Sequence, residues 1–328
     1  MLWPTLGAVR FFLALIVAAS HFWLYFPVFS NLLVLRYLCA PIAVFGFLFV
    51  SGYSIAASLA KQRRGFYWRR ALRIVPLYWI LIPLSSYLPF FFGGDILLLN
   101  GSKIIVPPIR ELLGNLFFLQ GFAVGSIPAN GVVWSLSIEI FFYAIAPFIV
   151  RVSQATLGLL VTALAVGFVL SASLHLPYYS EILHGGSVLL LGWCWLLGFW
   201  VYRAESCSQV LVAQCFGSVI IALNGTYVTH LWPVTWTIAV AGIEAGKQLP
   251  DLRYVAGFFS WLGDISYPFY IAHEPVFFLL YGMHCPLSPS LYFLVAILVS
   301  AVLDRFVDRP IKRRLVAFCC SEKRRIAS

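Results

Sequence analysis

The sequence predicts an all-α protein, a polytopic bundle of about ten transmembrane helices. Of its 328 residues, 62% are hydrophobic and only 10% are charged, whereas a soluble globular domain carries roughly 25% charged residues. The mean hydropathy is +0.92, and apolar runs close to ~20 residues, the length that crosses a bilayer as a helix, recur along the whole chain. The runs are apolar on both faces, which excludes the alternating strands of a membrane β-barrel. This composition also excludes a soluble enzyme and a disordered protein.

Ten spans fit the chain, and an even number of spans places both termini on one side of the membrane. A short apolar stretch in the one long connection, Leu112–Leu119, is expected to dip into the membrane without crossing it. We treat residues 1–328 as one membrane domain that ends in a basic tail over about 308–328. The expected spans cover residues 6–27, 37–59, 74–92, 132–150, 156–175, 186–202, 207–224, 227–244, 266–283 and 287–306.

Basic residues concentrate in two segments of a chain whose formal net charge is +10. The segment Lys61–Arg73 holds six basic residues and no acid, and the tail from Asp304 holds eight basic and three acidic residues. These segments contribute +6 and +5, so the rest of the chain sums to −1. By the positive-inside tendency, we expect both segments, and therefore both termini, in the cytoplasm. No basic soluble domain is present to form a nucleic-acid surface, so nucleic acid is not an expected partner.

Two polar residues in the first span, Arg10 and His21, lie on one stripe of the helix. Eleven residues at ~100° each bring them about 20° past three full turns, ~16 Å apart along the axis. Ala14 and Ala18 lie between them and would leave a shallow groove. Polar side chains inside a span are expensive and mark candidate functional sites. The alternative is that the small residues let a neighbouring helix pack closely, with His21 hydrogen-bonded in the bundle.

The second and third spans carry the next candidates. In Ser51-Gly52-Tyr53, Gly52 permits close approach by either a ligand or another helix. Arg69 and Arg73 are separated by four residues, so a helix would place two guanidinium groups side by side in a geometry that suits a phosphate or pyrophosphate. The alternative for this cluster is a topological signal that contacts the anionic headgroups of membrane lipids.

The fourth and ninth spans contain carboxylates and a histidine. Ser135, Glu139 and Tyr143 recur at intervals of four and form one polar stripe, and a lone intramembrane glutamate indicates either a lined cavity or a structural partner for an arginine. In the ninth span, Pro268 and Pro275 flank His273-Glu274 and are expected to break the helix. His273-Glu274 does not form the HExxH pattern of zinc proteases, and no other metal site is predicted. A structural hydrogen bond is the alternative role for His273.

Taken in order, these segments resemble the acyltransferase-3 family of integral membrane acyltransferases, which includes O-acetyltransferases of bacterial surface polysaccharides. Two positions depart from the family pattern: Asp308 stands where Glu is frequent, and Ile140 follows Glu139 where a second acid or another polar residue is common. The matching segments are Arg10 and His21 with ten residues between them, Phe49–Tyr53, Arg69–Trp79, Trp134–Tyr143, Ile265–His273 and Val307–Arg313.

The resemblance implies an activity and a location. The acyl donor would be cytoplasmic acetyl-CoA, used as a co-substrate without a metal. The acceptor would be a sugar hydroxyl of a lipid-linked or surface glycan such as the O-antigen of lipopolysaccharide. The enzyme would reside in the bacterial inner membrane and span it many times.

The resemblance also implies roles for individual residues. His21 would act as the general base, because a dehydrated imidazole tends to stay neutral, the form that a base needs. Arg10 and Glu139 would complete the catalytic set, and Glu139 would orient His21. The donor would be bound by Arg69, Arg70, Arg73, Ser51, Gly52 and Tyr53. The acceptor would be bound by Trp134, Ser135, Tyr143 and His273.

The expected depths of His21 and Glu139 match. Each lies six or seven residues from the outer end of its span, or ~9–11 Å from the outer boundary. We therefore expect the two side chains to share one cavity in the outer half of the bilayer, with the pantetheine arm of the donor lying beside Ala14 and Ala18. Two other functions remain open: a transporter of a polar solute built on broken helices, and an inactive scaffold of a glycan-assembly complex, which the presence of His21 disfavours.

Overall fold

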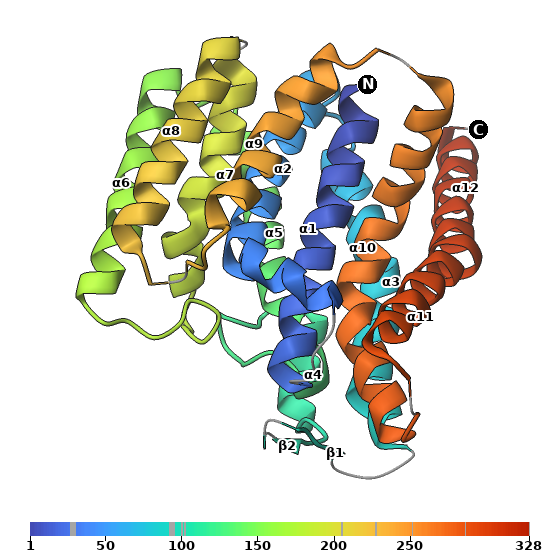
Figure 1. Ribbon diagram of the computed structural model, residues 1–328. Coiled ribbons are helices and arrows are strands. Elements are labelled where there is room, and N and C mark those ends of the chain that lie inside the picture. The colour runs from blue at the N-terminus through green and yellow to red at the C-terminus, as the bar shows by residue number, and fades with distance from the viewer. Residues whose placement is uncertain are drawn as a thin grey trace.

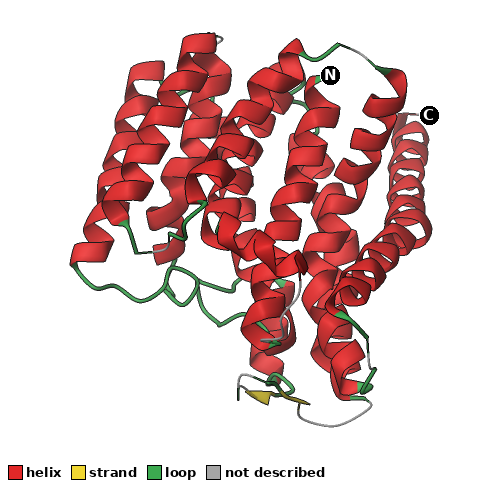
Figure 2. Ribbon diagram, viewed as in Figure 1, coloured by secondary structure: helices red, strands yellow, loops and turns green. Residues whose placement is uncertain are grey.

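The computed structural model describes residues 1–26, 31–91, 96–99, 101, 103–204, 206–226, 228–250, 252–285 and 287–327. Across this part of the chain the secondary structure is almost entirely helical (Figure 2). The exception is a pair of two-residue antiparallel strands, β1 (Ile96–Leu97) and β2 (Lys103–Ile104). The prediction of an all-α fold is therefore confirmed.

Every predicted span overlaps a helix, although residues 27, 92 and 227 of these spans lie outside the described part of the chain. The ten helices are α1 (Leu2–Tyr25), α2 (Ala40–Lys61), α3 (Phe66–Tyr87), α5 (Trp134–Ile149), α6 (Gln154–Ser173), α7 (Gly186–Ala204), α8 (Cys207–Asn224), α9 (Trp232–Gln248), α10 (Arg253–Gly282) and α11 (Pro289–Val302). The other described helical elements are η1 (Asn31–Leu38), η2 (Leu88–Phe90), α4 (Ile109–Leu116), η3 (Pro128–Val133), η4 (Leu303–Asp308) and α12 (Arg309–Ala327).

Six helical segments in the described part of the chain are long and apolar enough to cross a membrane. The other predicted spans are helical too, but α8 and α9 are short, with 18 and 17 residues, and α3 and α10 carry charged side chains that lower their hydropathy. The count of ten spans stays a prediction. The six segments are Leu2–Tyr25, Ala40–Lys61, Pro128–Ile149, Gln154–Ser173, Gly186–Ala204 and Pro289–Phe318.

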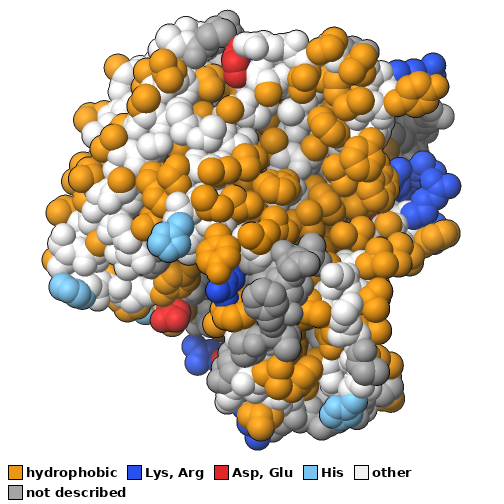
Figure 3. Space-filling model, in the orientation of Figure 1, with side chains coloured by type: hydrophobic (Ala, Val, Ile, Leu, Met, Phe, Trp, Pro, Cys, Tyr) orange, Lys and Arg blue, Asp and Glu red, His pale blue; other side chains and the backbone are white. Residues whose placement is uncertain are grey.

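The outer surface of the bundle is apolar over a broad area. Large hydrophobic side chains such as Leu159, Leu189 and Phe306 are more than 60% exposed, and Figure 3 shows hydrophobic side chains spread over most of the visible face. Soluble monomers rarely expose apolar patches of this extent. The surface and the apolar helices together identify a multi-pass membrane protein.

Helices α1 and α2 lie in the middle of the bundle, where α1 packs along α10 and α2 packs along α7 (Figure 1). The start of α1 and the last turns of α12 lie toward one end of the bundle, and α4 with the strand pair lies toward the other. We name these the terminal end and the opposite end. The assignment of the terminal end to the cytoplasm stays a prediction based on its basic segments.

Helix α10 departs from the sequence-based expectation. Pro268 and Pro275 were expected to break it, yet the helix continues from Arg253 to Gly282 through both prolines. Neighbouring helices and side chains can accommodate the backbone groups that a proline leaves unpaired. The discontinuous helix that favoured a transporter is therefore not observed.

Glycines allow α2 and α7 to approach closely. A Cβ atom placed on Gly52 would lie 1.9 Å from the carbonyl oxygen of Trp195, and one placed on Gly198 would lie 1.9 Å from that of Phe49. Small residues at such a crossing let two membrane helices pack backbone to backbone. Gly52 therefore serves helix packing, which was one of the two roles that the sequence left open for it.

We predict that Gly52→Ala destabilises the protein by more than about 1–3 kcal/mol, because the added methyl group overlaps the backbone of α7. The thermal unfolding midpoint in detergent should fall clearly. Gly167→Ala is the matched control, since its Cβ would meet no heavy atom within 4 Å, and its midpoint should stay level or rise slightly. Equal midpoints for both variants would contradict the close packing of α2 and α7.

Candidate active site

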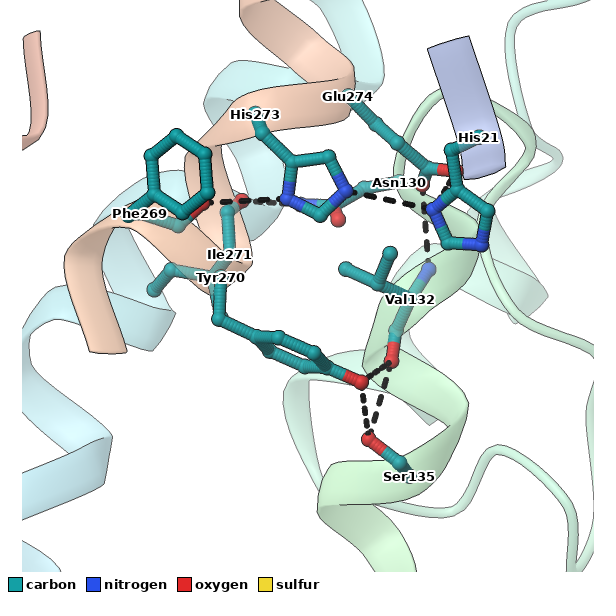
Figure 4. A network of polar contacts seen from close by, with 9 residues as sticks. All are labelled: His21, Asn130, Val132, Ser135, Phe269, Tyr270, Ile271, His273 and Glu274. Atoms are coloured by element: carbon teal, nitrogen blue, oxygen red, sulfur yellow. Dashed lines mark hydrogen bonds and ion pairs between the residues drawn. The ribbon is translucent and has the colours of Figure 1, made fainter. Parts of the chain in front are cut away.

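The first cluster of polar side chains joins α1 to α10 around His21 (Figure 4). Nδ1 of His21 lies 3.3 Å from Nε2 of His273 and 3.1 Å from Oε1 of Glu274. His21 and His273 also stack, with ring centroids 5.5 Å apart. The Glu274 side chain is 1% exposed, whereas the His21 side chain is 24% exposed. A buried carboxylate thus supports a partly accessible imidazole.

Glu274 has further partners that compensate its burial. Its Oε2 accepts a hydrogen bond of 3.1 Å from the backbone N–H of Val132, in the turn η3 that precedes α5. The hydroxyl of Tyr25 forms a side-chain hydrogen bond with the same carboxylate. Asn130, also in η3, donates to the carbonyl oxygen of Ile271 at 2.9 Å. These contacts fix the start of α5 against α10 and hold Glu274 beside His21.

The contacts also determine which nitrogen of His21 is available. Nδ1 of His273 lies 3.1 Å from the carbonyl oxygen of Phe269, and a carbonyl can only accept a hydrogen bond. In a neutral ring, Nε2 of His273 is then unprotonated and accepts from Nδ1–H of His21. The proton of a neutral His21 therefore resides on Nδ1. Its Nε2 is basic and points away from His273 (Figure 4).

The second cluster surrounds Glu139 and brings α2 and α5 together. Oε1 of Glu139 accepts hydrogen bonds from the hydroxyls of Ser51, at 2.8 Å, and Tyr143. Arg10 donates to Oγ of Ser54 at 2.7 Å and interacts electrostatically with Glu139. Of the polar stripe predicted on the fourth span, Glu139 is thus directed at α1 and α2, whereas Ser135 contacts Tyr270 of α10.

This second cluster borders an inner cavity between α1, α2, α3, α5 and α10. Among the residues that the sequence singled out, five line this one cavity: Arg10, Ser51, Arg73, Ser135 and Glu139. The cavity is lined by Arg10, Val44, Phe47, Leu48, Ser51, Arg73, Ile74, Ser135, Leu136, Glu139, Ser266, Tyr267 and Tyr270.

A second cavity, the mouth cavity, adjoins the inner cavity at the terminal end. Arg10, Arg73 and Tyr267 line both spaces, and the mouth cavity also reaches Trp3 near the start of α1. The two cavities therefore lie next to each other, one at the terminal end of the bundle and the other toward its middle.

Tyr270 separates the inner cavity from the His21 cluster. Its hydroxyl lies 2.8 Å from Oγ of Ser135 and 3.3 Å from the carbonyl oxygen of Val132, and its ring packs edge-on against Phe47 at 5.3 Å. Val132 in turn contacts Glu274. The sequence analysis did not single out Tyr270, although it lies in the segment Ile265–His273 used for the family resemblance.

The carboxylate beside His21 is Glu274 and not Glu139, which corrects the expected pairing. Glu139 follows Val132 by seven residues, about 10 Å along a helix axis, and Val132 is the residue at the level of His21. His21 is not among the described residues that line the inner cavity. The depth of each residue was predicted from span boundaries that are uncertain by several residues. This uncertainty was large enough to pair His21 with Glu139, although the two side chains lie about two helical turns apart.

Several predicted binding residues lie elsewhere. Tyr53 packs on Tyr202 of α7 at 5.3 Å, so both Gly52 and Tyr53 face α7 rather than the inner cavity. Trp134 packs on Tyr179 at 5.1 Å. Ala14 and Ala18 are fully buried among the helices, so the groove expected beside them is occupied by packing.

The three clustered arginines of α3 point in different directions. Arg73 lines both cavities. Arg69 donates to the carbonyl oxygens of Arg64, at 2.6 Å, and Gln62, while Arg70 donates to Oγ of Ser58 at 2.9 Å. The spacing of four residues was expected to place Arg69 and Arg73 side by side on one helix face. Instead, Arg69 donates its hydrogen bonds to nearby backbone carbonyl groups.

Comparison with known proteins supports one assignment. No curated protein and no solved structure matched the chain. The family model described as an acyltransferase domain, that of the acyltransferase-3 family, matches residues 3–303. The match runs from the first turn of α1 to the end of α11 and includes the His21 cluster and most of both cavities. The chain therefore belongs to the acyltransferase-3 family of membrane acyltransferases.

Proposed function

We propose that this chain transfers an acetyl group from cytoplasmic acetyl-CoA to a sugar hydroxyl of a lipid-linked or surface glycan in the bacterial inner membrane. The observation that carries the proposal is the arrangement of His21. Its Nδ1 is held by His273 and Glu274, its Nε2 is left basic, and the basic cavities reach Tyr270 from the terminal end. A membrane acyltransferase needs such a base where the donor and acceptor meet.

In the proposed reaction, Nε2 of His21 removes the proton of the acceptor hydroxyl. The hydroxyl oxygen attacks the thioester carbonyl carbon and forms the new C–O bond. The C–S bond then breaks, and the CoA thiolate takes the proton back from His21. Glu274 stabilises the imidazolium that exists between these steps, as the carboxylate does in hydrolytic triads. The products are the O-acetylated sugar and CoA.

The donor approaches from the mouth cavity. Arg73 and Arg10 line the route from the terminal end, and each can form a charge-assisted hydrogen bond with an anionic donor. Glu139 keeps Ser51 and Tyr143 in position and offsets part of the charge of Arg10. The ring of Tyr270 has to move before the thioester can reach His21.

The decisive experiment uses purified protein in lipid nanodiscs with acetyl-CoA and measures release of the free CoA thiol with and without a glycan acceptor. In parallel, surface glycans from cells with and without the protein are compared by mass spectrometry. We expect acceptor-dependent thiol release and loss of O-acetyl groups from cells that lack the protein. Movement of a solute across vesicles without thiol release would support a transporter instead.

We predict that His21→Ala leaves insertion and folding nearly intact but lowers acetyl transfer at least ~10²-fold, because the general base is lost. Thiol release under single-turnover conditions measures the change. His230→Ala is the matched control, since this exposed histidine lies outside the cluster. Near-normal turnover of the His21 variant would remove this residue from the mechanism.

Glu274→Gln keeps the shape of the side chain but removes its charge. We expect kcat to fall on the order of 10²-fold or more with little change in the KM for acetyl-CoA, because the imidazolium loses its counter-charge. Glu244→Gln, an acid on α9, is the control.

The two substitutions should also be non-additive, because the residues act as one unit. The double variant His21→Ala with Glu274→Gln should be no slower than His21→Ala alone. A further fall of the same size in the double variant would show that Glu274 acts independently of His21.

Removal of the ring at position 270 should open the inner cavity to the His21 cluster. We predict that Tyr270→Ala raises release of CoA thiol in the absence of acceptor several-fold, because water gains access to the thioester beside the base. Tyr270→Phe retains the ring, so its release of CoA thiol without acceptor should stay at the wild-type level. Thiol release from Tyr270→Ala at the wild-type level would contradict the barrier role of this residue.

A further inference from the structure

The mouth cavity is lined by more charge than the proposed reaction has used. Four cations and three carboxylates are among its described lining residues. The cations are Arg10, Arg73, Arg309 and Lys312, and the carboxylates are Asp264, Asp304 and Asp308. The charge of this lining remains +1 even with every carboxylate ionised. Such a surface suits an anion with several negative charges, since each phosphate oxygen can displace a carboxylate oxygen of similar geometry.

Two of these cations come from helix α12, at the C-terminal side of the bundle. Nε of Arg309 lies 2.7 Å from Oδ2 of Asp304, and its Nη2 lies 2.8 Å from Oδ2 of Asp264. Nζ of Lys312 pairs with Oδ2 of Asp308. The carboxylates thereby hold both cations at the cavity.

These cations are accessible to a ligand. The side chains of Arg309 and Lys312 are 35% and 29% exposed, whereas those of Asp304 and Asp308 are 8% and 4% exposed. Figure 3 shows Lys and Arg side chains gathered along the edge of the molecule where α12 lies. Asp304 and Asp308 thus hold the two cations from the buried side, while Asp264, at 54% exposed, contacts Arg309 at the surface.

Two of the three arginines that the sequence analysis expected to bind the donor have other partners in the structure. Arg69 and Arg70 are hydrogen-bonded to Arg64, Gln62 and Ser58, and of the three clustered arginines only Arg73 is among the described residues that line the mouth cavity. A donor with a pyrophosphate and a third phosphate requires more cations than Arg73 alone.

We propose that Arg309 and Lys312 bind the phosphate groups of a nucleotide-bearing acyl donor at the mouth cavity, together with Arg73. The proposal rests on the proposed function, in which the donor is a CoA thioester. Without donor, Asp264, Asp304 and Asp308 hold the two cations in place. When the donor binds, its phosphates replace carboxylate oxygens as their partners.

The mouth cavity extends along α1 toward the inner cavity. Trp3 lines the outer part of the mouth cavity, and Arg10, seven residues further along α1, lies where the two cavities meet. This is about 10 Å along the helix axis. With its phosphates at Arg309 and Lys312, the donor directs its arm past Arg10 into the inner cavity, toward Tyr270.

The test measures binding of adenosine 3′,5′-bisphosphate, a probe with the phosphates of the donor head but no thioester, to the full-length protein in nanodiscs. Lys312→Ala should weaken binding about tenfold or more, the expected loss of one charge-assisted contact. Arg313→Ala, which removes a charge from the adjacent, exposed position of α12, should leave the affinity unchanged. Equal affinities of Lys312→Ala and the wild type would overturn the proposal.

A second variant gives a change that misfolding cannot produce. Asp308→Asn keeps the shape of the side chain but removes the charge that competes for Lys312, so binding of the bisphosphate should become tighter. Unchanged or weaker binding would overturn the exchange of partners that we propose.

The outcomes also separate this proposal from the proposed function. If the bisphosphate binds through Lys312 but no acetyl transfer occurs, the mouth site stands and the proposed reaction fails. If acetyl-CoA is turned over but the bisphosphate does not bind, the reaction stands and the mouth site is overturned.

Discussion

The contact between Glu274 and His21 is the interaction on which the rest of the structure depends. A carboxylate in an apolar interior is costly unless it is paired and hydrogen-bonded. Glu274 receives the imidazole of His21 from α1, the N–H of Val132 from η3 and the hydroxyl of Tyr25. Because these partners come from separate elements, burial of one carboxylate requires α1, η3 and α10 to meet at one point. The same requirement fixes the tautomer of His21 through His273.

In the reaction that we propose, the site has two parts that serve different substrates. The charged route enters from the terminal end and passes Arg73 and Arg10, which is a suitable environment for an anionic donor. The His21 cluster lies beyond Tyr270, near the opposite end of α1, where a hydroxyl acceptor from the other side would bind. In the proposed reaction, a barrier between the two parts would protect a thioester from water until an acceptor is present. Glu139 would then belong to the donor part and Glu274 to the acceptor part.

Close helix packing makes this division possible. Gly52 and Gly198 bring α2 against α7, and the buried Ala14 and Ala18 do the same for α1. Residues that the sequence presented as candidates for ligand contact are used here to bring backbones together. The inner cavity lies instead between α1, α2, α3, α5 and α10.

The sequence by itself determined the helical fold, the location of every predicted span on a helix and the family, because hydropathy and local spacing depend only on neighbours along the chain. Only the tertiary structure decided that His21 pairs with Glu274, that Arg69 and Gly52 serve local structure, and that α10 continues through its prolines. Each of these depends on which faces of distant helices oppose one another. Periodicity defines the faces of a single helix, but the relative rotation and offset of two helices arise from packing, and an offset of two turns separates Glu139 from the histidine it was expected to orient.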